Sequence, residues 1–441
     1  MMAMLEKAEA PVTNECCIYR VPFDIRKLNQ DAYTPKVVSI GPFHHNGNPR
    51  LQNMEKHKLI YCKAFLERTN TSLESWIHYI QDVEPRFRSC YSDALEFTKE
   101  ELVKIILVDS GFIFGLFWLD SDRENSGNNG SILLKPWLTT NVRLDLLLLE
   151  NQLPFFVLDH LFDLSMQSYT SLSLPGEGKM AIPSFIALTF GYFSFYDTSN
   201  LRSNLSSHGV EIKHFTDLLR TFHLQHPQQS RDVETVEHLP SAAELSEAGV
   251  RFKANTTSTC CLLDLKFSGG VLEIPQLKVQ DWTELIFRNM VALEQCHYPD
   301  HSFVTDYVAV LDFLVNTSRD VDVLVQKGVL VNWLGDSDSV ADIFNGLWKN
   351  VTHINFSSHY IELSQKLNAF CRNPCHKLKS TLRRDYCKTP WQIAVSIAGI
   401  VLLVLSLVQS VCSVLQNVHN NNGFSRAISV ITIKAYEIEE G

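Results

Sequence analysis

The stretch IAVSIAGIVLLVLSLVQSVCSVL, residues 393–415, holds 14 leucine, isoleucine or valine residues in 23 positions. No Asp, Glu, Lys or Arg occurs between Thr389 and Ser425. A helix of this length would measure roughly 35 Å, enough to cross a hydrocarbon core of about 30 Å with some tilt. A buried core helix is the alternative, but such helices are seldom so long and free of charge. We therefore predict a transmembrane helix over residues 391–415, anchored by Trp391, Ile393, Val401, Leu405 and Leu415.

Basic residues gather just before this stretch. Only Arg426 and Lys434 follow it, so the positive-inside rule places the N-terminal bulk in the cytosol. The residues after the span, 416–441, form a short C-terminal tail. Residues 371–390 are predicted to be a basic juxtamembrane segment that also contacts anionic headgroups of the lipid bilayer. Its charges include Lys377, Lys379, Arg383, Arg384 and Lys388.

Seven Asn-x-Ser/Thr sequons favour the opposite orientation, because glycosylation requires exposure to the lumen. They begin at Asn70, Asn129, Asn204, Asn255, Asn316, Asn350 and Asn355. The eleven cysteines show no regular spacing and fit reduced cytosolic thiols better than a disulfide framework. We expect a single-pass protein of the plasma membrane with a cytosolic bulk, and we keep an extracellular bulk as the alternative.

The composition before the span is that of a folded protein. Hydrophobic residues make up 45% of the chain and charged residues 20%. The net charge of −10 argues against nucleic acid as a partner, because nucleic acid binding requires basic surfaces. Residues 1–14 contain no apolar signal region, and we expect them to be disordered.

Residues 15–370 are predicted to form a mainly α-helical globular domain with a small β-hairpin element. Helical spacing is found at 51–68, 91–118, 210–222 and, with a break at Pro154, 141–164. The second of these is apolar enough to resemble another span. Lys104 and Asp109 within it favour a buried core helix, because each would cost roughly 2.5–3.5 kcal/mol in a bilayer. A short strand is expected at Val37–Ile40, and a flexible insertion near 223–240.

The second half of this domain changes pattern twice. Residues 248–279 alternate with a period of two around Gly269 and Gly270, which predicts a hairpin. Helical patterns then resume at 281–296, 302–315, 320–327, 337–349 and 360–386.

Candidate chemical sites are weak. His44, His45 and His57 lack the spacing of metal ligands, and Cys371, Cys375 and His376 lack a fourth ligand. Asp336, Asp338 and Asp342 do not match a calcium loop, and capping of the next helix by Ser337 or Asp338 explains them better. Glu150 and Asn151 lie in an apolar run, where a buried carboxylate could have a raised pKa, although satisfying backbone groups near Pro154 is the simpler role. We therefore expect no catalytic residue, no metal site and no cofactor, and hence no enzyme.

Long blocks of the chain resemble one plant-specific family, known as "domain of unknown function 247". They are CCIYRVP at 16–22, AYTPKVVSIGPFHH at 32–45, LQNMEKHKLIY at 51–61, DLLLLENQLPFFVL at 145–158, SAAELSEAGVRFK at 241–253, and the runs 262–296 and 307–335. The resemblance implies a land-plant protein with a C-terminal membrane span and no established enzymatic activity. Certain members in grasses are linked to self-incompatibility.

These features together favour a membrane-anchored protein that acts by protein–protein recognition or signalling. The expected partners are an unidentified protein and the lipid bilayer, and a homo-oligomer is possible. Polar loops at 121–131 and 223–238 are candidate contact surfaces, because loops on a rigid scaffold often carry specificity. The alternatives are an unrecognised membrane-associated enzyme, with a pocket near His44, His57 or Glu150, and a structural membrane scaffold.

Overall fold

The computed structural model describes residues 14–45, 47–126, 135–172, 183–197, 211–224, 231–232, 236, 238–257, 261–352, 355–373 and 390–439. The chain divides into two units. The first, called the folded unit here, is Met1–Ser246 with Val250–Phe370, and the second is Cys371–Gly441 with Glu247–Gly249. The described part is mostly helical with small sheets, which confirms the coarse fold prediction.

Five helices in the first half of the folded unit pack around an aromatic core. They are α3 (Gln52–Thr69), α4 (Leu73–Ser89), α5 (Lys99–Ser126), α7 (Phe155–Leu172) and α8 (Phe185–Tyr192). Phe65, Phe114 and Phe162 meet at ring-centroid distances of 5.3–6.2 Å, so one aromatic residue from each of α3, α5 and α7 joins the core. Aromatic pairs of this kind add to the free energy of simple burial.

Helix α5 is a core helix, as predicted. Its apolar stretch Lys99–Asp122 is long enough to cross a membrane, but most of it is buried inside the protein. Asp109 is 1% exposed, and its Oδ1 lies 2.6 Å from Nζ of the fully buried Lys58 on α3. The helix begins at Lys99 and not near Tyr91 as expected, and the sequence patterns also missed α4 and α8.

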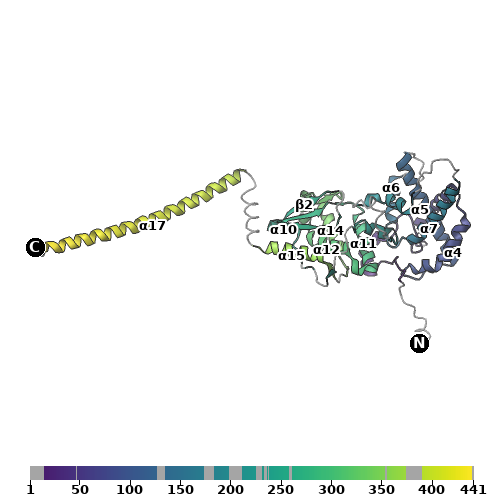
Figure 1. The fold of residues 1–441 in the computed structure, drawn as a ribbon, viewed down its shortest axis with the longest axis horizontal. Coiled ribbons are helices and arrows are strands. Elements are labelled where there is room, and N and C mark those ends of the chain that lie inside the picture. The colour runs from purple at the N-terminus through teal and green to yellow at the C-terminus, as the bar shows by residue number, and fades with distance from the viewer. Residues whose placement is uncertain are drawn as a thin grey trace, which may run out of the picture. The chain divides into compact units, whose positions relative to one another are not determined.

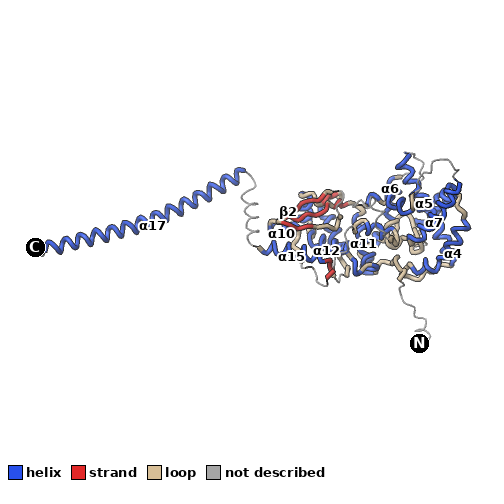
Figure 2. The backbone as a smooth tube through the Cα atoms, viewed as in Figure 1, coloured by secondary structure: helices blue, strands red, loops and turns tan. Residues whose placement is uncertain are grey.

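The second half contains further helices and the strands. The helices are α11 (Thr283–His297), α12 (Phe303–Leu314), α13 (Ser318–Gln326), α14 (Ser337–Leu347) and α15 (Ser358–Arg372). Strands β2 (Arg251–Asn255), β4 (Val271–Pro275) and β3 (Lys266–Ser268) form one sheet in that order, and β5 (Leu277–Val279) pairs with β6 (Leu330–Asn332). A third pair joins β1 (Arg231–Asp232) to β7 (Phe356–Ser357). Figure 2 shows the strands among α12 and α15 and away from α4, α5 and α7.

The predicted hairpin is present. Strands β3 and β4 are antiparallel, and Gly269 and Gly270 between them have φ of 57° and 74°, which favours glycine. Strand β2 pairs with β4 in parallel and extends the hairpin into a sheet of three strands. The predicted cap of α14 is one residue off, because Asp336 accepts the Ser339 N–H at 2.6 Å.

The strand predicted at Val37–Ile40 is absent, so that prediction is wrong. The N–H groups of Lys36, Val37 and Val38 all donate to the Asp145 carboxylate, at 2.7–2.9 Å, and Ile40 N–H donates to Asn151 Oδ1 at 2.7 Å. Side chains thus take the hydrogen bonds that a neighbouring strand would have made. The expected helix 141–164 is also two helices, α6 (Pro136–Asp145) and α7, on either side of this polar segment.

Short elements complete the folded unit. They are α2 (Phe23–Arg26), η1 (Gln30–Ala32), η2 (Pro49–Leu51), η3 (Ser194–Tyr196), α9 (Phe215–Thr221), α10 (Ala242–Ala248) and η5 (Pro299–His301). A small buried cluster ties the N-terminal segment to the two halves, since Val21 and Tyr33 pack with Leu149 and with Leu293 on α11.

Helix α17 (Pro390–Glu439) is the main element of the second unit (Figure 1). Its stretch Ala394–Asn417 is long and apolar enough to cross a membrane, and none of it is buried within the protein. The helix predicted for 391–415 therefore belongs to a longer one, and the predicted tail continues as helix to Glu439.

Candidate functional site

A solvent-open groove of about 520 Å³ lies between three stretches that are distant in the sequence. The segment around η1 forms one side, α6 another, and the first turn of α11 the third. The residues that matter most for its chemistry are Asp31, Lys36, Trp137, Asp281, Trp282 and Glu284.

The groove presents two tryptophans to solvent. Trp137 is 58% exposed and follows Pro136, which begins α6. Trp282 is half-buried at the N-cap of α11, and its ring lies 6.0 Å from that of Phe195, which is 63% exposed. Tryptophan is among the residues most enriched at the centres of protein interfaces. Their clustering at one hollow is the strongest sign of a binding surface in the described part of the chain.

Carboxylates dominate the charge of the groove. Asp31 and Asp281 are exposed, and among the described residues neither makes an ion pair. Glu284 accepts from Arg288 Nε at 2.7 Å and from Asn29 Nδ2 at 3.0 Å, so its charge is balanced within the fold. Lys36 is the one cationic side chain among the described lining residues. The groove therefore carries a small excess of negative charge.

Buried hydrogen bonds hold the floor of the groove in place. Ala32 accepts from Asn289 Nδ2 at 2.7 Å through its carbonyl, and its N–H donates to Asn29 Oδ1 at 3.2 Å. Asn289 Oδ1 accepts the Leu149 N–H at 2.9 Å. Lys36 is tied to the end of α6 through Asp145. A surface held in this way loses little conformational freedom on binding, which favours affinity.

Glu150 is the most extensively engaged carboxylate that the sequence singled out. It is 1% exposed; Oε1 accepts from Arg26 at 2.6 Å and from the Val21 N–H at 2.9 Å, while Oε2 lies 3.4 Å from Arg20 and 3.3 Å from His44 Nε2. Burial raises its pKa, but His44, the Val21 N–H and Arg26 lower it more, so the net pKa is below the usual glutamate value. The raised pKa considered for Glu150 is therefore wrong.

Asn151 and Gln152 extend this anchoring role. Asn151 donates to the carbonyls of Val38 and Asp145, and Gln152 donates to those of Leu146 and Leu148, at 2.7–3.0 Å. The polar residues of the apolar run thus satisfy backbone groups, which is the simpler role foreseen for Glu150 and Asn151. Asn151 thereby holds the N-terminal segment through Val38, and Gln152 holds the chain before Pro154 through Leu146 and Leu148. Over the described residues, no group of three or more histidine, cysteine, aspartate or glutamate side chains could hold a metal ion.

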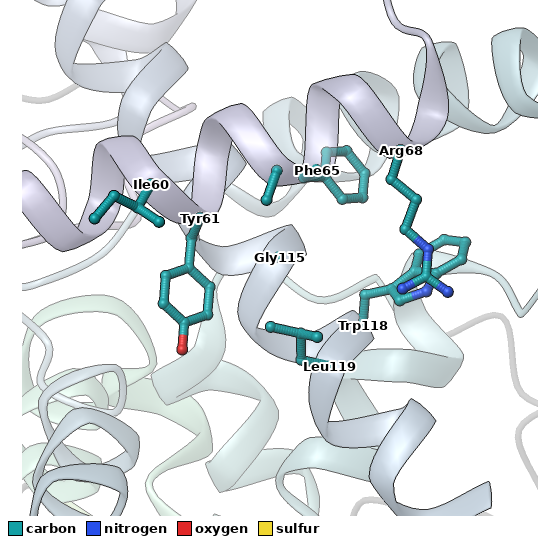
Figure 3. A pocket seen from close by; sticks show the side chains of 8 residues that line it. Ile60, Tyr61, Phe65, Arg68, Gly115, Trp118 and Leu119 are labelled. Atoms are coloured by element: carbon teal, nitrogen blue, oxygen red, sulfur yellow. The ribbon is translucent and has the colours of Figure 1, made fainter. Parts of the chain in front are cut away.

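A second, smaller cavity of about 180 Å³ lies between α3 and α5 (Figure 3). Its walls are almost entirely apolar, with Ile60, Phe65 and Leu119 among them. Arg68 at its edge lies over the Trp118 ring at 5.1 Å and pairs with Asp122 at 2.8 Å. Arg68, the only cationic side chain among the described residues that line this cavity, is therefore already paired within the chain.

The predicted anchor residues lie on α17. Trp391 is 77% exposed, Val401 49%, Leu405 53% and Leu415 62%, whereas the surroundings of the Ile393 side chain lie outside the description. The juxtamembrane charges Lys377, Lys379, Arg383, Arg384 and Lys388 fall in residues 374–389, which are not described. Much of the loops 121–131 and 223–238 is likewise outside the described residues.

Of the predicted sequons, Asn129 and Asn204 lie outside the described residues. Asn70, Asn316 and Asn350 are exposed, whereas Asn255 and Asn355 are half-buried. Asn355 also accepts from Arg231 Nε at 3.1 Å, so attaching a sugar there would disturb a packed contact. The exposed sequons are sterically compatible with either orientation.

Sequence reasoning missed the groove. Trp137 and Trp282 were each visible beside a helix start, after a proline and an aspartate respectively. No local pattern indicated that they would line the same hollow, because they are 145 positions apart.

Comparison with known proteins identifies relatives across nearly the whole chain. Residues 18–405 match DUF247, a family described as plant protein of unknown function. The UPF0481 protein At3g47200 of Arabidopsis thaliana is 27% identical over 95% of this chain and 90% of its own length. The putative UPF0481 protein At3g02645 of the same plant is 24% identical over 89% of each chain. No solved structure matches the chain significantly.

Proposed function

This chain belongs to the DUF247 family of plant proteins, and we propose that it is a membrane-anchored recognition protein. In this proposal α17 anchors the chain in the bilayer, and the folded unit binds a protein partner through the tryptophan-lined groove. The observation that carries it is the exposure of Trp137 beside Trp282 in a groove with a rigid floor. Exposed aromatic residues in a preformed hollow are the usual anchors of protein interfaces.

The anchoring half rests on the apolar stretch Ala394–Asn417 of α17, which contains no Asp, Glu, Lys or Arg. No part of the apolar stretch Ala394–Asn417 is buried by the described residues, whereas the equally long stretch in α5 is mostly buried. The excess of basic residues before the span favours a cytosolic folded unit at the plasma membrane. A cytosolic folded unit would act in signalling inside the cell, whereas an extracellular folded unit would act in recognition between cells.

Anchoring is tested by placing charges in the middle of the span. The double variant Val404→Arg, Val408→Arg adds about 5–7 kcal/mol to the cost of insertion. We expect this full-length variant to leave carbonate-washed plant membranes, while Ser410→Ala, on the same helix, stays in them. Retention of the double arginine variant in the membrane fraction would contradict a transmembrane role for α17.

Recognition is tested by photo-crosslinking in plant cells. A photoreactive benzoylphenylalanine at position 137 of the full-length chain should yield an adduct of defined mass with one protein. The same residue in place of Trp333, which is 66% exposed and does not line the groove, is the matched control. Absence of an adduct from position 137, or the same adduct from both positions, would argue against recognition through the groove.

An unrecognised enzyme is the alternative function. The carboxylate best placed for it by the sequence, Glu150, has both oxygens engaged by neighbouring groups, which weighs against a catalytic role. A structural scaffold built from copies of this chain is the other alternative, and in the crosslinking experiment it would appear as an adduct of the chain with itself.

A further inference from the structure

We infer that the groove takes a basic segment of its partner, with an arginine or lysine side chain lying against Trp137 and Trp282 beside Asp31 and Asp281. The inference rests on the proposed recognition function and specifies the chemistry of the partner. It concerns a peptide segment because the groove is open to solvent and its volume of about 520 Å³ exceeds the needs of one side chain.

Charge complementarity is the first argument. Asp31 lies in η1 and Asp281 lies just before α11, and no ion pair within the described residues neutralises either. The negative charge of Glu284 is already neutralised by Arg288. The remaining charges of the groove are the positive charge of Lys36 and the negative charges of Asp31 and Asp281. A basic side chain would gain attraction from both aspartates, whereas an acidic segment, a phosphate or an anionic headgroup would be repelled.

The aromatic lining is the second argument. Tryptophan is the best aromatic partner for a cation, and arginine is the cation most often found over such rings. The fold uses this contact repeatedly in its interior: Arg220 lies 4.0 Å from the Tyr298 ring centroid and Arg143 lies 4.6 Å from that of Tyr192. Among the described residues no cation lies over Trp137 or Trp282. The exposed Trp137 and the half-buried Trp282 are therefore the rings to which a partner can bring a cation.

Carboxylates without an ion pair and tryptophan rings without a cation over them occur together in the groove, and not among the described lining residues of the cavity between α3 and α5. That cavity also contains a tryptophan, Trp118, but Arg68 of the same chain already covers its ring and pairs with Asp122. The groove thus presents tryptophans and carboxylates in a similar combination, and among the described residues no cation lies over its tryptophan rings. A partner's arginine or lysine would supply it.

The test selects peptides from a random library of 12-residue peptides. The bait is the full-length chain in discs of phosphatidylcholine, whose neutral headgroups do not compete for charge. We expect the enriched peptides to contain arginine or lysine, and replacement of that residue by glutamine to weaken binding about tenfold. Trp137→Ala in the bait should have a similar effect, whereas Trp333→Ala should have none.

Charge is tested separately with Asp281→Asn, and with Asp338→Asn as an exposed control on α14. Binding to Asp281→Asn should weaken severalfold at low salt, and the difference should shrink as salt screens the interaction. Enrichment of acidic or uncharged peptides, no enrichment at all, or basic peptides that bind Trp137→Ala equally well would each overturn the inference. A crosslink from position 137 to a partner would still support recognition in those cases, so the two proposals can fail independently.

Discussion

Replacing Glu150 should release the N-terminal segment from the rest of the folded unit. The carboxylate accepts hydrogen bonds from Val21 and Arg26 in a site that is 1% exposed. Removing one partner of a buried ion pair costs about 3–5 kcal/mol. Arg26 and Arg20 retain 26% and 43% exposure and can turn to water, so we take the lower end, about 3 kcal/mol, for Glu150→Ala. Glu150→Gln keeps an acceptor for the Val21 N–H and should cost less, about 2 kcal/mol.

Hydrogen exchange on the full-length chain in detergent measures this loss locally. A change of about 3 kcal/mol corresponds to more than a hundredfold faster exchange of the amides around Val21 at pH 7. Because the folded pKa of Glu150 is lowered, its contribution is complete above the unfolded value of about 4.3 and is lost as the pH falls below it. Glu362→Ala, which removes an exposed ion pair with Lys366, is the control. Exchange around Val21 within threefold of the wild type would refute the anchoring role.

Three further outcomes are expected for unfolding of the full-length chain. Burial lowers the pKa of His214 to about 4, so its contribution to the free energy of unfolding is complete above pH 6.5 and falls by up to about 3 kcal/mol as the pH drops from 6.5 to 4. The variant His214→Gln should flatten this dependence of unfolding free energy on pH, and an unchanged dependence would contradict the role given to His214. Gly111→Ala should destabilise by roughly 1–3 kcal/mol, because its new Cβ would lie 2.3 Å from Cys62 Sγ, whereas Gly399→Ala, with open space around it, should leave the folded unit's melting temperature unchanged. Lys58→Met should lower the free energy of unfolding by about 3–5 kcal/mol, because it leaves the buried Asp109 without its cation. Adding Asp109→Asn to this variant should restore part of the lost stability, and urea titrations of the single and the double variant measure both effects.

Much of the helical architecture could be predicted from the sequence. The helices at 52–69, 283–297 and 303–314 lie within a few residues of where periodic apolar patterns placed them. The buried position of α5 followed from two charges inside an apolar run. These predictions succeeded because periodicity and charge are local properties that a helix carries wherever it packs.

The predictions that failed depended on partners distant in the sequence. The strand expected at Val37–Ile40 is absent because Asp145 and Asn151, more than 100 positions away, take its N–H groups. Glu150 was considered for a raised pKa on the basis of burial alone, but the groups that lower its pKa, His44, the Val21 N–H and Arg26, all lie more than 100 positions away. Local composition contains no information about such pairs.

The sequence by itself determined the family, the mainly helical fold and the apolar stretch at 393–415, since each depends on residue type and spacing along the chain. Only the tertiary structure decided the position and lining of the groove. Asp31, Trp137 and Trp282 lie on separate elements and meet because α6 and α11 both pack against the N-terminal segment. The free energy that brings them together comes from the burial of residues outside the lining, such as Tyr33 and Leu149, so the groove leaves no pattern in the sequence of its own lining.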